Sequence, residues 1–293
     1  MTRILCIGEA MVELSAQGDL WRAGIAGDTL NTAWYLRRLL GPSHHVGYLT
    51  RVGRGDFSRR AVDFMAAEGI DTSHVTTDPT REIGLYAITL TEGERSFTYW
   101  RDTSAARGLA DGPDRLQSAL VGCDIAYLSG ITLAILPDAG RAALLDALRG
   151  RDVVFDPNLR PRLWPDAGRM RAAITEAAGL AALVLPSFDD EAAHFGDADP
   201  KATIARYRAA GAGQVVVKNG GGPVAYGGPE GSGVVDDLPR DRPVDSTAAG
   251  DSFNAAYLAA RLEGGTCADA IRAGHALSRR VIAHPGALVR AAV

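Results

Sequence analysis

The sequence has little of what marks secreted, membrane-bound or nucleic-acid-binding proteins. Only three cysteines, Cys6, Cys123 and Cys267, occur in 293 residues, and their wide spacing predicts reduced thiols in place of a disulfide framework or a metal cluster. No apolar run approaches the roughly 18 residues of a membrane span, and the N-terminus leads into a strand without a signal-peptide pattern. The net charge of −4 gives no general reason to bind nucleic acid. We therefore expect a cytoplasmic protein with no nucleic-acid or membrane partner.

Two nucleotide-binding motifs are also missing. No Gly-x-x-x-x-Gly-Lys-Ser/Thr loop occurs, which excludes a P-loop enzyme. Gly53-Arg54-Gly55 lacks the third glycine of a dinucleotide-binding turn. The composition, 46% hydrophobic and 23% charged, is otherwise ordinary for a globular enzyme. The length allows one large domain or two smaller ones.

Short apolar runs alternate with helical stretches along most of the chain. The runs predict strands buried on both faces at Ile4–Gly8, Ile125–Ser129, Val153–Asp156, Leu183–Pro186 and Val215–Lys218. Helical periodicity lies between them at Pro137–Leu148, Asp166–Ala178 and Lys201–Ala210. This alternation predicts an α/β fold with a doubly wound, mostly parallel sheet and helices on both faces. Ligands of such folds bind at the carboxyl ends of the strands, which are followed here by Glu9, Gly130, Asn158, Ser187 and Asn219.

Two segments break this alternation. Met11–Ile25 and Ile83–Arg101 are strand-like but have no helices between their strands. Glu92-Gly93-Glu94 is a hairpin turn signal between two alternating strands. We expect a small antiparallel sheet of residues 11–25 and 83–101, standing apart from an α/β core of residues 1–10, 26–82 and 102–293.

The stretch Val244–Tyr257 carries the strongest chemical signal. Small residues at 246–250 let a turn lie close to a ligand, and helical periodicity starts at Ser252. Asp251 is thereby placed at a helix N-terminus, where unpaired backbone N–H groups bind anions such as phosphate. A carboxylate beside a phosphate site is suited to take the proton of an attacking hydroxyl. A capped helix after a small-residue turn is the alternative.

Two segments at opposite ends of the chain resemble the markers of one family. Asp245-Ser246-Thr247-Ala248-Ala249-Gly250-Asp251 resembles the Asp-Thr-x-Gly-Ala-Gly-Asp signature of the ribokinase-like (PfkB) carbohydrate kinases. Ser246 keeps the hydroxyl of the replaced threonine, and Ala248, which replaces the first glycine, is expected to need only an ordinary backbone angle. Ala26-Gly27-Asp28-Thr29-Leu30-Asn31 resembles the family's Gly-Gly-x-x-x-Asn sugar-binding turn, with Ala26 at the first glycine.

The residues in and before the N-terminal marker indicate one branch of the family. Ile7–Leu14 and Gly27–Thr32 are most similar to the 2-keto-3-deoxygluconate kinase branch, and the resemblance runs from about residue 4 to about residue 289. It implies ATP-dependent phosphorylation of the terminal hydroxyl of 2-keto-3-deoxygluconate, giving 2-keto-3-deoxy-6-phosphogluconate. A kinase for fructose or another sugar acid is one alternative. A non-catalytic sugar- or nucleotide-binding regulator is another, which the intact Asp251 disfavours. The galactonate epimer of the substrate differs at one hydroxyl and is not distinguished.

The resemblance also implies roles for the residues of both markers. Asp251 is the expected base, and the expected anion hole consists of the amides of Ala248, Ala249, Gly250 and Asp251. Gly27, Asp28 and Asn31 are expected to bind the sugar. The small sheet is expected to act as a lid over the sugar and to form the contact of a homo-oligomer.

Two arginines favour an acidic sugar. A carboxylate calls for the bidentate grip of arginine, and both Arg160 and Arg101 match arginines of the keto-deoxygluconate kinase branch. Solvated arginines paired with Asp102 or Asp156 are the alternative. Two further expected sugar contacts are Tyr99 and Tyr86; packing in a hairpin core is the alternative for Tyr86.

A nucleotide site is expected in addition to the sugar site. Val215–Lys218 and the following glycines resemble the family's strand and Lys-x-Gly turn, so Lys218 and Gly220 are expected near ATP phosphates or ribose. A hairpin turn with a surface lysine is the alternative. His275 lies where the family lines its adenine pocket; a helix-face histidine without a ligand is the alternative. The other nucleotide-site residues expected are Ser187, Ser246, Ala248 and Gly250.

A magnesium ion is expected beside Pro186–Glu191. The family often has Asn-x-x-Glu there, whereas this chain has Ser187 at the Asn position and Asp190 at the Glu position, followed by Glu191. Mg²⁺ keeps several waters and needs few carboxylates, so Asp190 or Glu191 is the expected ligand. Acidic residues that merely favour the start of a helix are the alternative.

Overall fold

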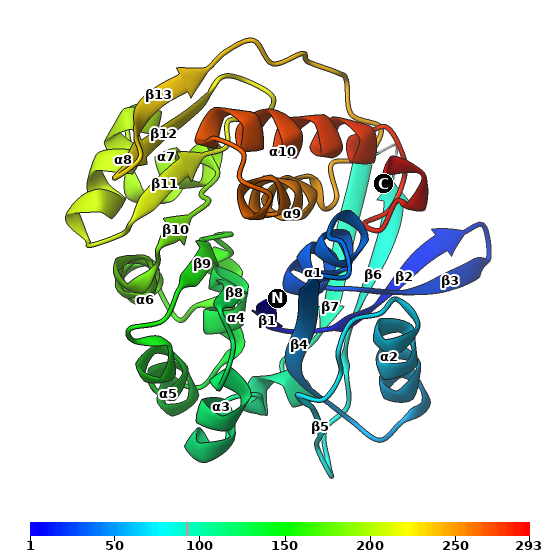
Figure 1. Ribbon diagram of the computed structural model, residues 1–293. Coiled ribbons are helices and arrows are strands. Elements are labelled where there is room, and N and C mark those ends of the chain that lie inside the picture. Colours follow the sequence, from blue (N-terminus) through cyan, green and yellow to red (C-terminus); the bar gives the residue numbers. More distant parts are fainter. Residues whose placement is uncertain (92–93) are drawn as a thin grey trace.

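A nine-stranded sheet forms the centre of the computed structural model, which describes residues 1–91 and 94–293 (Figure 1). The strands follow the order β13-β12-β11-β10-β9-β8-β1-β4-β5. Their bounds are β1 Thr2–Ile7, β4 His44–Val52, β5 Val75–Thr77, β8 Ile125–Ser129, β9 Val153–Asp156, β10 Leu183–Val184, β11 Gln214–Val217, β12 Val224–Gly228 and β13 Gly231–Val235.

The predicted parallel sheet is confirmed. Every neighbouring pair from β11 to β5 is parallel, and β12 and β13 add an antiparallel edge. β9 and β11 are buried along their whole length, which explains their valine-rich runs. β10 ends earlier than the predicted strand Leu183–Pro186, because Pro186 has no N–H for the ladder.

Helices cover both faces of this sheet (Figure 1). One hydrophobic cluster joins Leu116, Leu144 and Tyr207 to the sheet, and a second cluster on the other face contains Leu30 and Tyr257. The first layer is α3 Pro113–Leu120, α4 Gly130–Ile135, α5 Asp138–Leu148, α6 Ala167–Leu180, α7 Phe188–Phe195 and α8 Pro200–Ala209; the second is α1 Asp28–Leu39, α2 Asp56–Ala67, α9 Ala249–Leu262 and α10 Cys267–Ile282. Short 3₁₀ turns lie at Ala105–Gly108, Pro161–Leu163 and Arg290–Ala292.

The three predicted helices are confirmed as α5, α6 and α8. Pro137 and Asp166 precede their helices as N-cap residues, and the Asp166 carboxylate accepts a hydrogen bond from the amide of Arg169. Asp199 caps α8 in the same way. None of the described helices combines the length and apolar character needed to cross a membrane.

A separate four-stranded sheet stands beside the main one (Figure 1). It is ordered β3-β2-β6-β7, with bounds β2 Met11–Gln17, β3 Leu20–Ala26, β6 Gly84–Thr91 and β7 Glu94–Trp100. Both hairpins are antiparallel as predicted, but they join through a parallel pair in which Met11 lies opposite Gly84. The predicted turn Glu92-Gly93-Glu94 falls partly outside the described residues.

Candidate active site

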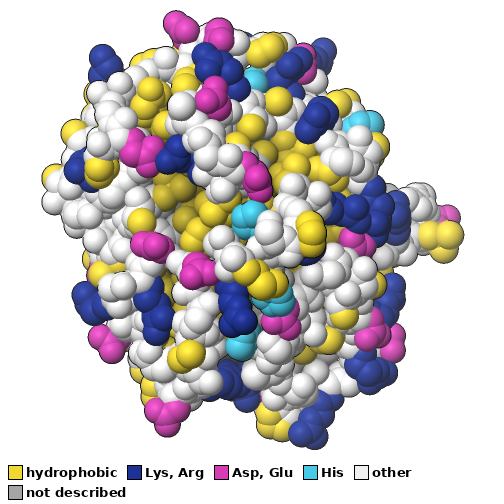
Figure 2. All heavy atoms as spheres, in the orientation of Figure 1, with side chains coloured by type: hydrophobic (Ala, Val, Ile, Leu, Met, Phe, Trp, Pro, Cys, Tyr) yellow, Lys and Arg dark blue, Asp and Glu magenta, His cyan; other side chains and the backbone are white. Residues whose placement is uncertain are grey.

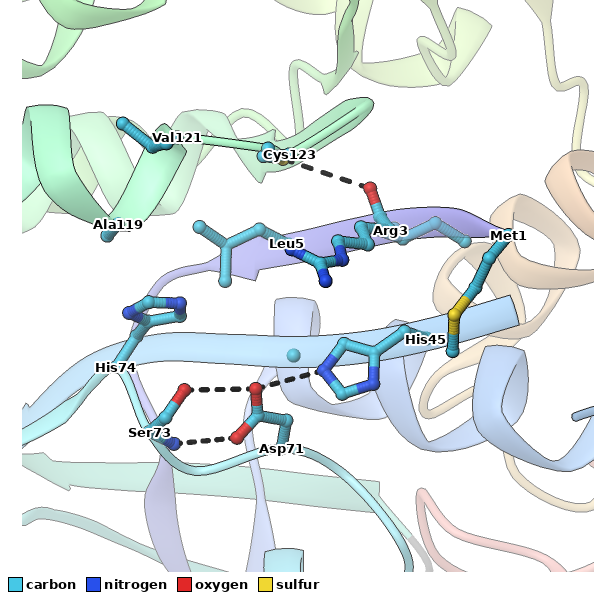
Figure 3. A pocket seen from close by; sticks show the side chains of 13 residues that line it. Met1, Arg3, Leu5, His45, Asp71, Ser73, His74, Ala119, Val121 and Cys123 are labelled. Atoms are coloured by element: carbon cyan, nitrogen blue, oxygen red, sulfur yellow. Dashed lines mark hydrogen bonds and ion pairs between the residues drawn. The ribbon is translucent and has the colours of Figure 1, made fainter. Parts of the chain in front are cut away.

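A cavity of about 760 Å³ opens beyond the carboxyl ends of the main strands. Its lining combines Glu9 after β1, Asp156 at the end of β9 and Lys218 after β11 with the small sheet and the start of α9. A smaller cavity of about 400 Å³ lies at the amino ends of β1 and β4, where His45 is hydrogen-bonded to Asp71 (Figure 3). In open α/β sheets the ligand lies outside the carboxyl ends of the strands. The larger cavity is therefore the candidate active site.

Charge over the visible surface gives no further guide. Figure 2 shows acidic and basic side chains interspersed over one face of the molecule. This agrees with the small net charge of −4. Any preference for an anion must come from the local geometry of the cavity.

The N-terminus of α9 faces this cavity. Within the turn, the Ala249 amide donates to the Ser246 carbonyl (3.2 Å) and the Ser252 amide donates to the Ala248 carbonyl (2.9 Å). In the described part of the chain, the amides of Gly250 and Asp251 are left without a backbone acceptor. Of the predicted anion hole, these two amides and the amide of Ala248 have no backbone acceptor among the described residues, whereas the amide of Ala249 is engaged.

The turn before α9 is fixed by Asp245. Its carboxylate accepts hydrogen bonds from the amides of Thr247 (2.9 Å) and Gly286 (2.6 Å). At the end of the turn, Ala248 has φ 60° and ψ 16°. The expectation of an ordinary backbone angle at Ala248 is therefore wrong: the turn needs the left-handed conformation that glycine adopts without strain. The residue also packs against the apolar cluster beneath the small sheet, which includes Met11.

Asp251 is buried in the first turn of α9. Its carboxylate accepts a hydrogen bond from the Asn31 amide (2.8 Å), so α1 and α9 meet at this group. Burial, followed by the charge of Asp28, raises the pKa of Asp251 to about 8. Asp156 adds to this rise, whereas Asn31 and Lys218 oppose it. A carboxylate poised near neutral pH is suited to act as a base.

Lys218 points into the cavity, contrary to the surface-lysine alternative. Its Nζ lies 3.0 Å from both Asp156 Oδ2 and Asn254 Oδ1, and the Asn254 amide donates to the same aspartate (2.6 Å). A Cβ built on Gly250 would lie 3.5 Å from Nζ. Lys218 therefore places its cation beside the open amides of α9. The turn after it contains Gly220 with φ 49°.

The other predicted nucleotide residues lie around the same cavity. Ser187 and Ser246 are part of its lining. His275 also lines it, and its Nε2 is hydrogen-bonded to the Pro239 carbonyl (2.7 Å). The histidine therefore holds the loop that borders the cavity through Nε2.

The sugar-binding turn is shaped by close backbone contact. Gly27 has φ 145°, and a Cβ there would lie 2.2 Å from the Glu9 carbonyl oxygen, so only glycine fits. Asp28 follows it and accepts a hydrogen bond from the Asn158 amide (2.9 Å). Together with Asn31, both residues line the cavity as predicted.

Three aromatic rings from the small sheet cover the cavity. Tyr86 lies 5.7 Å from Tyr99 and 6.3 Å from Phe97 between ring centroids, and all three line the cavity. The Tyr86 hydroxyl donates to Glu13. Such rings provide a flat apolar surface for the face of a sugar.

Both predicted arginines line the cavity, with different partners from those anticipated. Arg101 is buried and paired with Glu9, and its guanidinium lies 5.9 Å from the Tyr99 ring centroid. The Arg160 side chain is 51% exposed and lies 3.6 Å from Asp190. Neither of the expected partners, Asp102 and Asp156, is paired with these arginines.

The structure separates the two predicted metal ligands. Asp190 lines the cavity, but Glu191 is fully buried on the other side of α7, where it accepts hydrogen bonds from Tyr207 (2.9 Å) and Arg206 (2.6 Å). Successive helix residues point about 100° apart, so both cannot face one ligand. Glu191 is therefore a structural residue, and its assignment as a metal ligand is wrong. No cluster of three metal-binding side chains occurs among the described residues.

Four further residues at the cavity had no specific role in the sequence analysis. Asp156 ends β9 and Glu9 follows β1, and the position of Glu9 after a strand was the only signal noted for it. Asn254 lies one turn after Asp251, and Phe97 alternates with Tyr99 on one strand face.

Comparison with known proteins identifies the family. A model of the pfkB family of carbohydrate kinases matches residues 1–291. The chain belongs to this family. The 2-dehydro-3-deoxygluconokinase of Escherichia coli (strain K12) is 39% identical over 300 residues, covering 98% of this chain and 97% of that protein.

Two solved structures share the whole fold. The PfkB protein from Polaromonas sp. JS666 matches with a TM-score of 0.86 and 32% identity, covering 99% of this chain and 98% of that one. The fructokinase of Xylella fastidiosa, solved with bound ATP, matches with a TM-score of 0.82 over 97% of this chain and 93% of that one. At 24% identity the second likeness concerns the fold alone. The predicted ribokinase-like architecture is confirmed.

The left-handed conformation of Ala248 in this pfkB kinase predicts how glycine substitutions in the turn affect stability. Left-handed alanine is strained by roughly 1–2 kcal/mol, whereas glycine in a helix costs about 0.5–1 kcal/mol. Ala248→Gly should therefore destabilise the protein less than Ala249→Gly, by about 1 kcal/mol or more in unfolding free energy. Urea unfolding of the two neighbouring variants measures the difference. Equal destabilisation by both would contradict a strained Ala248.

Proposed function

We propose that this chain is an ATP-dependent kinase that phosphorylates the terminal hydroxyl of 2-keto-3-deoxygluconate. The proposal rests on one cavity that holds a buried carboxylate, Asp251, beside open helix amides, together with four described arginines, of which Arg101 and Arg160 are the two proposed to face the sugar. The E. coli relative named 2-dehydro-3-deoxygluconokinase supports the choice of substrate. A neutral sugar would have no use for two arginines in its site.

In the proposed reaction the terminal hydroxyl of the sugar lies against Asp251. As the hydroxyl oxygen forms a bond to the γ-phosphorus of ATP, the bond from that phosphorus to the β–γ bridging oxygen breaks and ADP leaves. Asp251 takes the hydroxyl proton, and the Asn31 amide holds the carboxylate in place. The amides of Gly250 and Asp251 and the Lys218 ammonium stabilise the negative charge on the transferred group.

ATP would occupy the part of the cavity bordered by Lys218, Gly220, Ser246, Ser187 and His275. When bound, Mg²⁺ would neutralise charge on the ATP phosphates. Asp190 is the described carboxylate that fits this ion. It lines the cavity and is only partly shielded by Arg160, and Mg²⁺ that keeps its waters needs no more than one or two such groups. The cytoplasm supplies both ATP and Mg²⁺, and we propose that the enzyme works there.

The small sheet has two proposed roles, one for each face. Strand alternation and register put Met11, Tyr86 and Tyr99 on the face toward the cavity, where the sheet would act as a lid over the sugar. The same register puts Trp21 and Trp100 on the opposite face, on the two edge strands of the sheet, where they are 49% and 58% exposed. Exposed tryptophans on one sheet face favour a subunit contact, so we propose a homo-oligomer through this face.

The role of Asp251 predicts a pH profile. Because its pKa lies at about 8, kcat/KM should fall about tenfold per pH unit below that value, as the base becomes protonated. Asp251→Asn should lower turnover by about 10² to 10⁴ and abolish this acid limb. Steady-state rates from pH 5.5 to 9.5 check both. A variant within a few-fold of the wild type would remove Asp251 from the role of base.

Stability provides a control that does not depend on turnover. The folded-state pKa of Asp251 is raised above the unfolded value near 4, so stability from the bound proton is complete below about pH 4 and lost as pH rises through about 8. Asn carries no such proton. The thermal stability of Asp251→Asn relative to wild type should therefore increase from pH 4 to pH 8, which calorimetry measures.

Arg160 tests the substrate class. A charge-assisted contact is worth roughly 1.5–3 kcal/mol, so Arg160→Leu should raise KM for 2-keto-3-deoxygluconate by about 10- to 100-fold and leave neutral sugars nearly unaffected. Arg160→Lys should raise this KM less than Arg160→Leu does, because lysine keeps the charge but lacks the planar guanidinium that binds a carboxylate through two hydrogen bonds. ADP release across a panel of acidic and neutral sugars measures this. A wild-type enzyme that prefers fructose or ribose would refute the proposed substrate, and an equal loss on all sugars would make Arg160 structural.

The outer face of the small sheet tests the assembly. Trp21→Glu and Trp100→Glu together should convert the oligomer into monomers, because each places a charge in an apolar contact. Val121→Glu, at an exposed position outside both sheets, is the matched control. Sedimentation velocity gives the masses, and circular dichroism checks the fold. A monomeric wild type, or variants that keep its mass, would overturn this contact.

A further inference from the structure

Glu9 occupies an unusual place for a carboxylate. It follows β1 of the main sheet and precedes β2 of the small sheet, its side chain is 1% exposed, and it belongs to the cavity wall. Arg101, its partner, directly follows β7 and is 8% exposed. The ion pair therefore joins the two sheets inside the wall of the cavity.

Two glycines make room for Glu9. A Cβ on Gly84, at the start of β6, would lie 2.5 Å from Glu9 Oε1. A Cβ on Gly27, before α1, would lie 2.2 Å from the Glu9 carbonyl oxygen. Any side chain at either position would displace Glu9, so the surrounding backbone is shaped around this residue.

Arg101 is the main compensation for the buried charge of Glu9. Burial raises the pKa of Glu9, and among the groups that oppose this rise Arg101 contributes most. The Ser104 side chain also favours the ionised form of Glu9, and the charge of Asp28 disfavours it. Removing either member of a buried pair leaves the other charge uncompensated.

The contact engages one edge of the guanidinium. Nη2 of Arg101 donates to Glu9 Oε2, and Nε is buried without a partner. In the described part of the chain Nη1 has no protein partner either, and the residue belongs to the cavity lining. Glu9 thus holds the guanidinium of Arg101 through Nη2 alone, and Nη1 of this cavity-lining residue is left available to a ligand.

We propose that Glu9 is a positioning residue, which orients Arg101 for the carboxylate of the sugar acid and so contributes to substrate choice. This inference rests on the proposed function. Its effect passes through Arg101: Glu9 neutralises the buried cation, so the arginine binds the substrate by the geometry of its N–H groups more than by net charge.

A double-mutant cycle tests this route. Glu9→Gln keeps the shape but removes the charge, and it should raise KM for 2-keto-3-deoxygluconate about tenfold, with kcat and the KM for ATP changed less than twofold. In an Arg101→Gln background the same change should alter KM less than twofold, because the residue it positions is gone. Glu9→Asp, whose shorter side chain keeps the charge, should lie between Gln and wild type.

Glu68→Gln is the matched control. Glu68 is also largely buried and ion-paired, with Arg38 and Arg290, but it lies outside the cavity. Its loss should lower stability without changing KM. An equal effect of Glu9→Gln in both backgrounds would mean that Glu9 acts independently of Arg101 and would overturn the proposal. So would a lower KM in Glu9→Gln, which would show Glu9 competing with the substrate carboxylate.

A substrate-free measurement separates this inference from the proposed function. The NMR resonance of the Arg101 Nε–H group can be assigned by its loss in Arg101→Gln. In the wild type it should be resolved and should exchange slowly with solvent. In Glu9→Gln it should move to the averaged position of a mobile arginine. A wild-type enzyme inactive on the sugar acid would refute the function while leaving this spectroscopic test intact. If the Arg101 Nε–H resonance is unchanged in Glu9→Gln, the positioning role of Glu9 is refuted and the proposed function is unaffected.

Discussion

The hydrogen bond between Asn31 and Asp251 is the contact on which the site depends. It joins residues 220 positions apart in sequence and holds the N-terminal turns of α1 and α9 together at the cavity. Each helix begins after a residue with positive φ, Gly27 or Ala248, so both turns bring their N–H groups toward the same space. The positive ends of two helix dipoles then face a carboxylate that has been removed from water. Without the Asn31 donor, only Lys218 would remain among the leading groups that favour its ionised form.

The cations of the cavity are balanced by acids to different degrees. Lys218 and Arg101 are paired with carboxylates that are almost fully buried, whereas Arg160 pairs with a partly exposed Asp190 at 3.6 Å. An exposed pair contributes little and exchanges partners readily, while a buried one is costly to separate. Of these three cations, Arg160 is therefore the one that can most readily leave its partner for a ligand. Lys218 and Arg101 instead present N–H groups in fixed directions, and a substrate anion must fit them.

The sequence indicated most of the fold because its signals were local. Apolar runs and helical periodicity identified β1, β8, β9, β10 and β11 and helices α5, α6 and α8. Small residues at 246–250 followed by helical periodicity identified the start of α9. The parallel pairing of β2 with β6 was missed because it depends on register between segments about 70 residues apart. Glu191 was misassigned because sequence alone did not say which side of α7 faces the cavity. Glu9 was noted only as a polar residue after a strand, and Asn254 was overlooked, because their importance lies in partners distant in sequence, Arg101 and Lys218.

Ala248 shows why a departure from a family signature has to be judged in three dimensions. The turn demands a left-handed residue, and alanine there is strained, yet its methyl group packs on the cluster that contains Met11, Tyr86 and Ile88. A glycine would relieve the strain and lose that contact. The same residue thus connects the turn that presents the Gly250 and Asp251 amides to the underside of the small sheet. Movement of that sheet would be felt at the anion-binding turn through this contact, because closely packed groups transmit displacement instead of absorbing it.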